Sequence, residues 1–176
     1  MQMPVYLKDV YEFSELDTFG SVLIVPCRFC PAASLAVRRQ APYFELFKHF
    51  LKTASYEQYL DRFRFGLEKK GIKADIFNSH LPHQFVVCMW TSRRRKKLMK
   101  RAKNYDAVVV MGCEAAVQTI CDAIESTLCK VFQGMRTEGI MSIKPLFHLP
   151  CSISLELNRV TPLLHRAEHP EPWVCL

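Results

Sequence analysis

The chain has 176 residues, a formal net charge of +7 and 49% hydrophobic residues, which fits one globular domain with a sizeable core. No apolar run approaches the roughly 20 residues of a membrane-spanning helix, and the polar, acidic start lacks the apolar region of a secretory signal. We therefore expect neither a disordered nor a membrane-bound chain, and we expect it in the cytoplasm.

The first strand is expected directly after a short lead-in. Residues 1–20 show only a loose helical spacing from Tyr6 to Leu16, and they end at Gly20. Residues 21–26 read Ser-Val-Leu-Ile-Val-Pro, which is typical of a strand covered on both faces and ended by its proline. Pro31 fits the first turn of a helix that continues to Arg39.

The middle of the chain is expected to be mainly helical. Apolar residues recur at helical spacing from Pro42 to Leu51, and again over 56–70, where Gly71 ends the pattern. Residues 74–77 then read as a short strand and 78–82 as a loop. Residues 85–89 are apolar enough for a short strand or a buried turn.

The last third begins with a basic helix over 92–104, for which Thr91 or Ser92 supplies the cap. A strand over 106–111, a helix over 114–126 and a strand over 130–132 follow, and 143–149 and 152–157 are further strand candidates. We divide the chain into a lead-in (1–20), one α/β metal-binding domain (21–160) and a flexible tail (161–176). Strands alternating with helices predict a three-layer α/β fold, with a mainly parallel sheet, helices on both faces and flavodoxin-like layering.

Four cysteines stand at predicted strand or loop ends, and three of them, Cys27, Cys30 and Cys113, follow the carboxyl ends of predicted strands. Cys27 and Cys30 follow the first strand, Cys88 follows the apolar stretch from residue 85, and Cys113 follows the strand over 106–111. Ligands of such folds gather outside the carboxyl ends of the strands, so we expect these four thiols to converge on one metal centre. Four thiolates suit tetrahedral Zn²⁺ or a [4Fe–4S] cluster. The remaining cysteines, at 121, 129, 151 and 175, are expected to be buried and to need no metal.

Two other interpretations of the cysteines stay open. Cys27 and Cys30 also fit a redox dithiol, because that motif in thioredoxin-like sites likewise follows a strand and opens a helix. A thioredoxin-like site, however, gives no role to Cys88 or Cys113. All four cysteines can also be simple buried side chains.

Three motifs together resemble one known family. They are Pro26-Cys27-Arg28-Phe29-Cys30, then Cys88-Met89-Trp90, then Gly112-Cys113 followed by Glu-Ala-Ala-Val-Gln-Thr. Their order looks like the small accessory subunit, or C-terminal domain, of anaerobic methylenetetrahydrofolate reductases, over about residues 20–140. Members similarly show a strand, a Cys-x-x-Cys, a Cys-x-Trp and a strand ending in a Cys followed by Val-Gln-Thr. Glu114, Ala115 and Ala116 stand where glycines are usual, so the chain looks like a divergent or stand-alone member.

The resemblance implies a [4Fe–4S] cluster, with Zn²⁺ as the alternative, held by Cys27, Cys30, Cys88 and Cys113. It also implies a non-catalytic subunit that docks on a larger flavoprotein reductase or methyltransferase of anaerobic one-carbon metabolism. The centre would transfer electrons or stabilise the interface. The sequence itself contains no Ser/His/Asp pattern, Gly-x-Gly-x-x-Gly or phosphate-binding loop that would indicate independent catalysis.

Several residues near the cysteines are candidates for a supporting role. Trp90 can shield the centre, Glu114 can orient it, and Gln118 can face it one turn along. Core packing explains Trp90 equally well, a favourable charge at the helix start explains Glu114, and an ordinary exposed helix position explains Gln118. His80, His83 and His148 are candidate ligands or proton carriers, although surface loop positions are the commoner explanation.

Basic residues concentrate in one window from Arg93 to Lys103. We expect this helix to contact an acidic face of the partner through Arg94, Lys97 and Arg101. A solvated helix face is the ordinary explanation of such a charge run, and a nucleic-acid-binding module with a structural zinc is another. Nucleic acid and membrane are the less expected partners.

Overall fold

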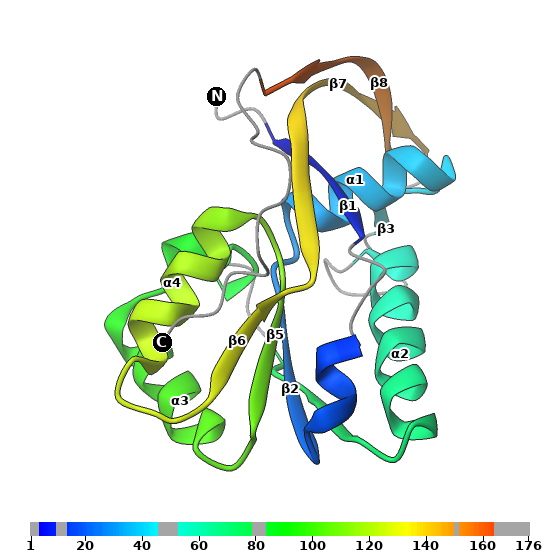
Figure 1. Cartoon of the computed structure of the whole chain (residues 1–176). Helices are drawn as coiled ribbons and strands as arrows, with labels where there is room; N and C mark the ends of the chain where they lie inside the picture. Colours follow the sequence, from blue (N-terminus) through cyan, green and yellow to red (C-terminus); the bar gives the residue numbers. More distant parts are fainter. Residues whose placement is uncertain (1–3, 10–13, 46–52, 79–83, 150–151, 164–176) are drawn as a thin grey trace.

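The computed structural model describes residues 4–9, 14–45, 53–78, 84–149 and 152–163. They form two four-stranded sheets, one parallel and one antiparallel (Figure 1). The parallel sheet has the strand order β4-β2-β5-β6. Its strands are β2 (Ser21–Pro26), β4 (Lys73–Ile76), β5 (Ala107–Met111) and β6 (Lys130–Gln133).

Helices cover both faces of the parallel sheet. The side chains of β2 alternate between two cores: Val22 and Ile24 lie in one with helices α1 (Cys30–Arg39) and α2 (Ala54–Lys69), whereas Leu23 and Val25 lie in the other with α3 (Ser92–Ala102) and α4 (Glu114–Ile124). Because both faces are buried, β2 and β5 read as continuous apolar runs in the sequence. The expected three-layer α/β fold with a parallel sheet is confirmed.

The strand order creates a point at which the chain reverses its direction of winding. Taken in chain order, the four parallel strands are arranged 2-1-3-4, which matches the beginning of the flavodoxin-like order. The reversal lies between β2 and β5, which pair from Val22 opposite Ala107 to Pro26 opposite Met111. The loops that follow these two strands therefore lie side by side at the carboxyl end of the sheet, where folds of this class bind ligands.

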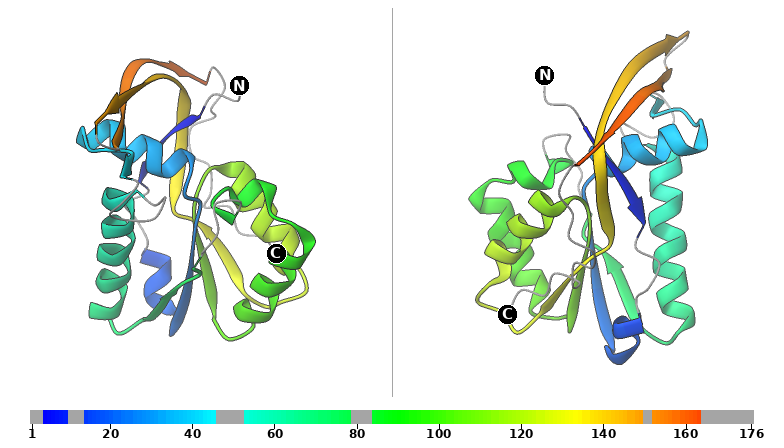
Figure 2. Two further views of the ribbon diagram at one scale, coloured as in Figure 1. Left: turned by 180° about the vertical axis from the view of Figure 1, so that it is seen from behind. Right: turned by 45° about the horizontal axis from the view of Figure 1, so that its top comes forward.

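The second sheet was not predicted as a unit. It is antiparallel, with the order β1-β7-β8-β3, and its β7–β8 hairpin extends beyond the helices (Figure 2). The strands are β1 (Val5–Asp9), β3 (Phe44–Glu45), β7 (Met135–His148) and β8 (Ser152–Pro162). The strands expected over 143–149 and 152–157 are present but belong to longer ones, and β7 begins almost directly after β6.

Two local predictions differ from the structure, and a third segment takes one of its two expected forms. The lead-in, where the spacing was loosely helical, contains a strand over residues 5–9, because that segment pairs with β7. Its only described helical part is a short 3-10 turn, η1 (Ser14–Thr18). Phe44 lies in a strand rather than in a helix, and residues 46–52 of that expected helix lie outside the described residues. Residues 87–89 form a 3-10 turn, η3 (Val87–Met89), which agrees with a buried turn rather than a strand.

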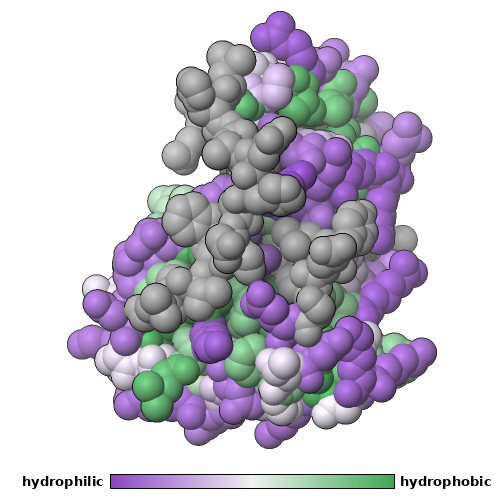
Figure 3. Space-filling model, in the orientation of Figure 1, coloured by the Kyte–Doolittle hydropathy of each residue, from purple (hydrophilic) through white to green (hydrophobic). Residues whose placement is uncertain are grey.

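Most of the face seen in Figure 3 is hydrophilic, with an apolar group at the top, over the β7–β8 hairpin. Across the described part of the chain, no helix is both long and apolar enough to cross a membrane. The tail expected from residue 161 is described only to residue 163, within and just after the end of β8.

Candidate metal centre

Cys27 and Cys113 are brought together where the winding of the parallel sheet reverses. The backbone amide of Cys27 donates to the carbonyl of Met111 at 3.0 Å, which continues the β2–β5 pairing into the two loops. A Cβ atom on Gly112 would lie 3.3 Å from Cys27 Cβ and 2.7 Å from Ala116 Cβ. Gly112 is therefore required for the close approach of the loop that carries Cys113.

Cys88 is carried by the turn η3, which is fixed to the Cys-x-x-Cys loop. The amide of Arg28 donates to the carbonyl of Phe85 at 2.8 Å, and the backbone of Val87 lies near enough to the Cys27 thiol to act on its pKa, which it lowers. Val87 itself is fully buried in the core beside α3 and α4. The residue before Cys88 is thus held directly against Cys27.

The four thiols lie near enough to one another for the charge of one to raise the pKa of another. Burial is the main reason why the pKa of Cys27 is raised to about 12, and the neighbouring thiols of Cys30 and Cys113 contribute to that rise. Burial likewise raises the pKa of Cys30 to about 11, with added contributions from Cys113 and Cys88. For Cys88, burial and the thiol of Cys113 raise the pKa. Each of the four thiols therefore takes part in at least one such interaction with another.

The thiols differ in exposure. Cys27 is only 3% exposed, Cys30 and Cys113 are half-buried, and Cys88 is exposed. Together they form a short series that runs from the core, through the two loops, to the surface at η3.

The chemistry of this donor set fits a soft metal ion or cluster. Thiolates prefer such metals, and the nearby backbone of Phe29 and Val87 acts to lower the pKa of Cys27, as that of Val5 does for Cys30. Cys30 is the first residue of α1 and Cys113 caps α4, so two helix N-termini favour negative charge at these sulfurs. Within the described residues, however, no three His, Cys, Asp or Glu side chains already have the spacing of a metal site. Metal ligation therefore requires side-chain movement.

The three supporting residues are placed differently from one another. Trp90 is buried beside Cys27 in the same core, and its ring nitrogen donates to the carbonyl of Gln84 at 2.8 Å. Burial of Glu114 opposes its ionisation, but hydrogen bonds from Thr137, from its own backbone and from Gln133 lower its pKa. Gln118 lies on the exposed side of α4 and donates to Asp122 at 2.8 Å. Glu114 therefore ties α4 to the strands that follow it, and the structure pairs Gln118 with Asp122 of its own helix.

The docking residues also differ from expectation. Arg94 is buried: its guanidinium lies 4.2 Å from the ring centre of Phe77 and 5.1 Å from that of Trp90, and it donates to the carbonyl of Asn78 at 2.6 Å. The expectation that Arg94 contacts a partner is therefore wrong, because position 94 falls on the inner face of α3.

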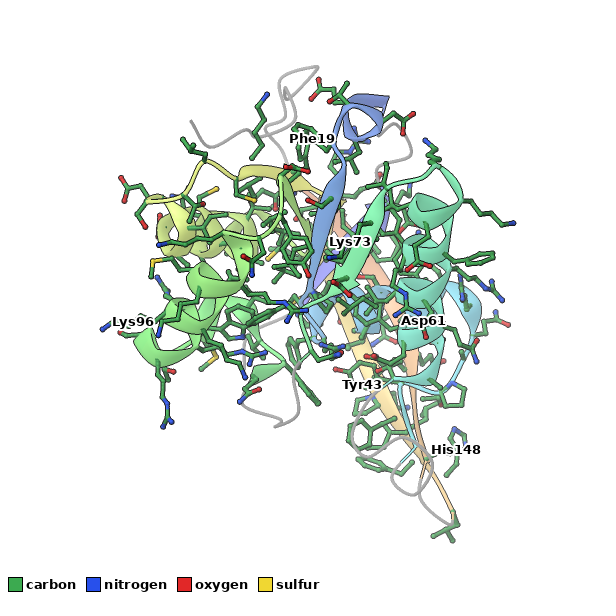
Figure 4. All side chains as sticks on the ribbon, turned by 90° about the horizontal axis from the view of Figure 1, so that it is seen from below. Phe19, Tyr43, Asp61, Lys73, Lys96 and His148 are labelled. Carbon is green, nitrogen blue, oxygen red and sulfur yellow. The ribbon has the colours of Figure 1, made fainter. Side chains whose placement is uncertain are left out.

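The rest of the basic helix does face outward. Lys97 and Arg101 are exposed, and Arg101 lies 3.8 Å from Asp75. Lys96 points away from the body of the molecule (Figure 4). The outward basic face of α3 comprises Arg93, Lys96, Lys97, Lys100, Arg101 and Lys103.

His148, the one histidine within the described residues, gives no support to a mixed site. His148 lies at the far end of the β7–β8 hairpin (Figure 4), exposed and 2.7 Å from the hydroxyl of Ser154. His80 and His83 lie outside the described residues.

Two buried polar groups near the site were missed by sequence reasoning. The Arg28 side chain is almost fully buried and pairs with Glu57 at 2.6 Å and 3.1 Å. Tyr56 is also buried, and its hydroxyl donates to the carbonyl of Met111 at 3.2 Å. These contacts fix the start of α2 to the same edge of the sheet. The only sequence signal was the position of Arg28 inside the Cys-x-x-Cys.

The other cysteines separate into two kinds. Cys121 and Cys129 are both buried, as expected. Cys129 is a free thiol, whereas Cys121 is disulfide-bonded. Cys151 and Cys175 lie outside the described residues.

Comparison of the chain with known proteins finds no matching family, no curated relative and no matching solved structure.

Proposed function

We propose that Cys27, Cys30, Cys88 and Cys113 bind one metal centre, a [4Fe–4S] cluster or Zn²⁺, in a non-catalytic accessory subunit. The supporting observation is that three loops, distant in sequence, carry these thiols to one end of the parallel sheet, where they influence one another's ionisation. The motif order that resembles the accessory subunit of anaerobic methylenetetrahydrofolate reductases favours the cluster over zinc.

A cluster would supply one-electron transfer, and zinc would supply a structural cross-link between the loops. The residues of the chain would provide the sulfur ligands and, around Cys27, a water-poor setting. Cys27 lies deepest and Cys88 lies at the surface. In this account, the face around η3 is the side from which a partner reaches the centre.

The partner is a larger flavoprotein reductase or methyltransferase subunit of one-carbon metabolism. This part of the proposal derives from the resemblance, and the exposed basic face of α3 is the matching surface for an acidic partner. Since α3 follows η3 after only two residues, a partner seated on α3 would also lie close to Cys88.

A thiol–disulfide oxidoreductase at Cys27 and Cys30 is less well supported. Reactive dithiols need an accessible thiolate of lowered pKa. Cys27 is only 3% exposed, and burial raises its pKa to about 12.

A nucleic-acid-binding module remains the second candidate, because the outward face of α3 is basic. Binding to nucleic acid that weakened steeply with salt would favour this alternative.

The proposed role places the chain in the cytoplasm. The free thiols of Cys27, Cys30, Cys88, Cys113 and Cys129 agree with a reducing compartment, but the disulfide at Cys121 opposes it. The mass of the intact protein, purified after its thiols are blocked at lysis, shows whether the chain contains a disulfide in the cell. A chain with all cysteines blocked supports the cytoplasm, and a retained disulfide contradicts it.

Metal analysis of the wild-type chain, purified without oxygen, tests the proposed centre. We expect either four irons with a broad visible absorbance that bleaches on reduction, or one zinc in a colourless protein. A chain that contains neither metal and takes up neither when supplied contradicts the proposal.

A further inference from the structure

Arg28 has a buried hydrogen-bond donor that the fold leaves unused. Its Nε and Nη2 atoms donate to Glu57 at 2.6 Å and 3.1 Å, and the residue is 5% exposed. Nη1 is also buried, yet it has no hydrogen-bond partner within the described part of the chain. Because a guanidinium is planar, Nη1 lies on an edge turned away from Glu57. A buried donor without an acceptor is costly, so this edge is suited to an acceptor from outside the chain.

Arg28 lies where folds of this class bind their ligands. It stands in the loop after β2, two residues before α1 and beside the reversal of winding between β2 and β5. The amide of Ala33 donates to the carbonyl of Phe29 at 3.0 Å, which closes the first turn of α1. No described side chain caps this helix start, and its first turn contains no acidic residue. The amides at such a helix start favour an anion.

A second arginine lies close to Arg28. The amide of Arg28 donates to the carbonyl of Phe85, and the ring nitrogen of Trp90 donates to the neighbouring carbonyl of Gln84, both at 2.8 Å. The Arg94 guanidinium lies 5.1 Å from the ring centre of Trp90. Burial lowers the pKa of Arg94, and the like charge of Arg28 contributes to that decrease. A bound anion would offset this repulsion between two positive charges.

The geometry restricts the ligand to a small oxyanion. A guanidinium edge matches the oxygens of phosphate and carboxylate groups, and hydrogen bonds between charged partners are the strong kind. Because Arg28 is only 5% exposed, a large ligand has no direct access to Nη1. The helix start adds amide donors for a group with several oxygens, which favours phosphate over carboxylate.

We propose that Nη1 of Arg28 and the start of α1 form a binding site for a phosphate ion, with Arg94 as a further source of positive charge. Glu57 is a positioning residue, because it holds the other edge of the Arg28 guanidinium. The inference goes beyond the proposed function and does not rest on it, since none of these three side chains is a proposed metal ligand. It gives the arginine inside the Cys-x-x-Cys a role of its own.

The test measures binding of inorganic phosphate to the full-length chain by isothermal titration calorimetry at constant ionic strength. Arg28→Lys keeps the positive charge but removes the second edge of the guanidinium. Arg136→Lys is the matched control, because Arg136 is exposed on β7 and pairs with Glu138 at 3.6 Å. Acetate and phenyl phosphate are the comparison ligands.

We expect the wild type to bind one phosphate ion per chain in a saturable manner. Arg28→Lys should weaken this binding by about 10-fold or more, the size expected for the loss of one charge-assisted hydrogen bond. Arg136→Lys should bind phosphate like the wild type, and acetate should bind the wild type more weakly than phosphate does. Weaker binding of phenyl phosphate would assign the site to the free ion, and equal binding would assign it to the phosphate group of a larger molecule.

A wild type without saturable phosphate binding would overturn the site and leave the proposed metal centre standing. Equal phosphate affinity of Arg28→Lys and the wild type, or tighter binding of acetate than of phosphate, would overturn it too. If Arg28→Lys does not fold, Arg28→Met/Glu57→Met takes its place, because apolar replacement of a buried ion pair often leaves stability unchanged. Undiminished phosphate binding by that double variant would likewise contradict the site.

Discussion

At the scale of single residues, burial distinguishes the thiols more sharply than the sequence does. In sequence, Cys27 and Cys30 look like an equivalent pair, yet Cys27 is 3% exposed and Cys30 is half-buried. Cys88 is the exposed thiol of the four candidates. Reactivity requires thiolate and access. Cys88 is thus the residue at which metal protection is easiest to observe.

We predict that Cys88 is alkylated fastest among the free thiols of the metal-free protein. Zinc should slow its alkylation strongly, because a metal-bound sulfur is no longer a free nucleophile. Cys129 is the internal control: burial raises its pKa to about 11, so it should react slowly below that pH, with or without zinc. Time-resolved mass spectrometry after peptide digestion measures each site. Equal rates at Cys88 in both states would contradict its role as a ligand.

Arg94 is the second residue for which the structure changes the interpretation. Its planar guanidinium lies over two aromatic rings and donates to the Asn78 carbonyl. Lysine has neither the planar stacking nor the same donor geometry. We expect Arg94→Lys to lower the free energy of unfolding by about 1–3 kcal/mol.

Denaturant unfolding measures this cost, and the neighbouring Arg93→Lys is the matched control. Arg93 is exposed, so its replacement should change the free energy of unfolding by less than about 0.5 kcal/mol. Similar values for the two variants would show that Arg94 does not stabilise the fold in this way.

At the scale of elements, α3 combines two roles on opposite faces. Arg94, Leu98 and Ala102 face the core, and the outward face is basic. The pair between Arg101 and Asp75 is exposed on both sides, and exposed pairs of this kind contribute little stability. The outward charges can therefore be reversed with little effect on the fold.

We predict that the double variant Lys97→Glu/Arg101→Glu loses its co-purifying partner from cell extract, because the partner's acidic face would be repelled. Arg62→Glu/Lys69→Glu reverses two exposed charges on α2, across the sheet, and should retain the partner. Quantitative mass spectrometry of the co-purified proteins compares the variants. Equal partner recovery with both double variants would rule out α3 as the docking surface.

The β7–β8 hairpin is a further element with an uneven surface. Ile143, Pro145 and Phe147 lie opposite Leu157, Leu155 and Ile153 in the register, so one face of the outer hairpin is apolar. Phe147 is 78% exposed. Exposed apolar surface of this kind is common at contact sites, which gives the hairpin a surface chemistry distinct from that of α3.

At the scale of the whole molecule, the sequence predicts the parallel layer well and the antiparallel layer poorly. β2 and β5 are continuous apolar runs, α2 and α4 have apolar residues at helical spacing, and α1 has Pro31 in its first turn, so local pattern was sufficient for these elements. β1 is a strand because it pairs with β7, more than 120 residues away, and its own loose periodicity indicates nothing of this. The first half of β7 alternates buried and exposed residues but includes Arg136, Glu138 and Gly139, which obscured the pattern.

The candidate site divides in the same way. The thiols were predicted together because each follows a predicted strand or apolar stretch, and parallel strands end at one edge. The pairing of buried Arg28 with half-buried Glu57, the position of Arg94 and the hydrogen bond from the Leu7 amide to Ser34 depend on tertiary packing. They could not be read from spacing or composition.

The most direct test of the four-cysteine centre is the metal content per chain of single Cys→Ser variants, purified side by side with the wild type. The account predicts one centre in the wild type, loss of most of the metal in Cys27→Ser, Cys30→Ser, Cys88→Ser and Cys113→Ser, and full metal content in Cys129→Ser. Undiminished metal in Cys88→Ser or Cys113→Ser, or equal loss in Cys129→Ser, would contradict it.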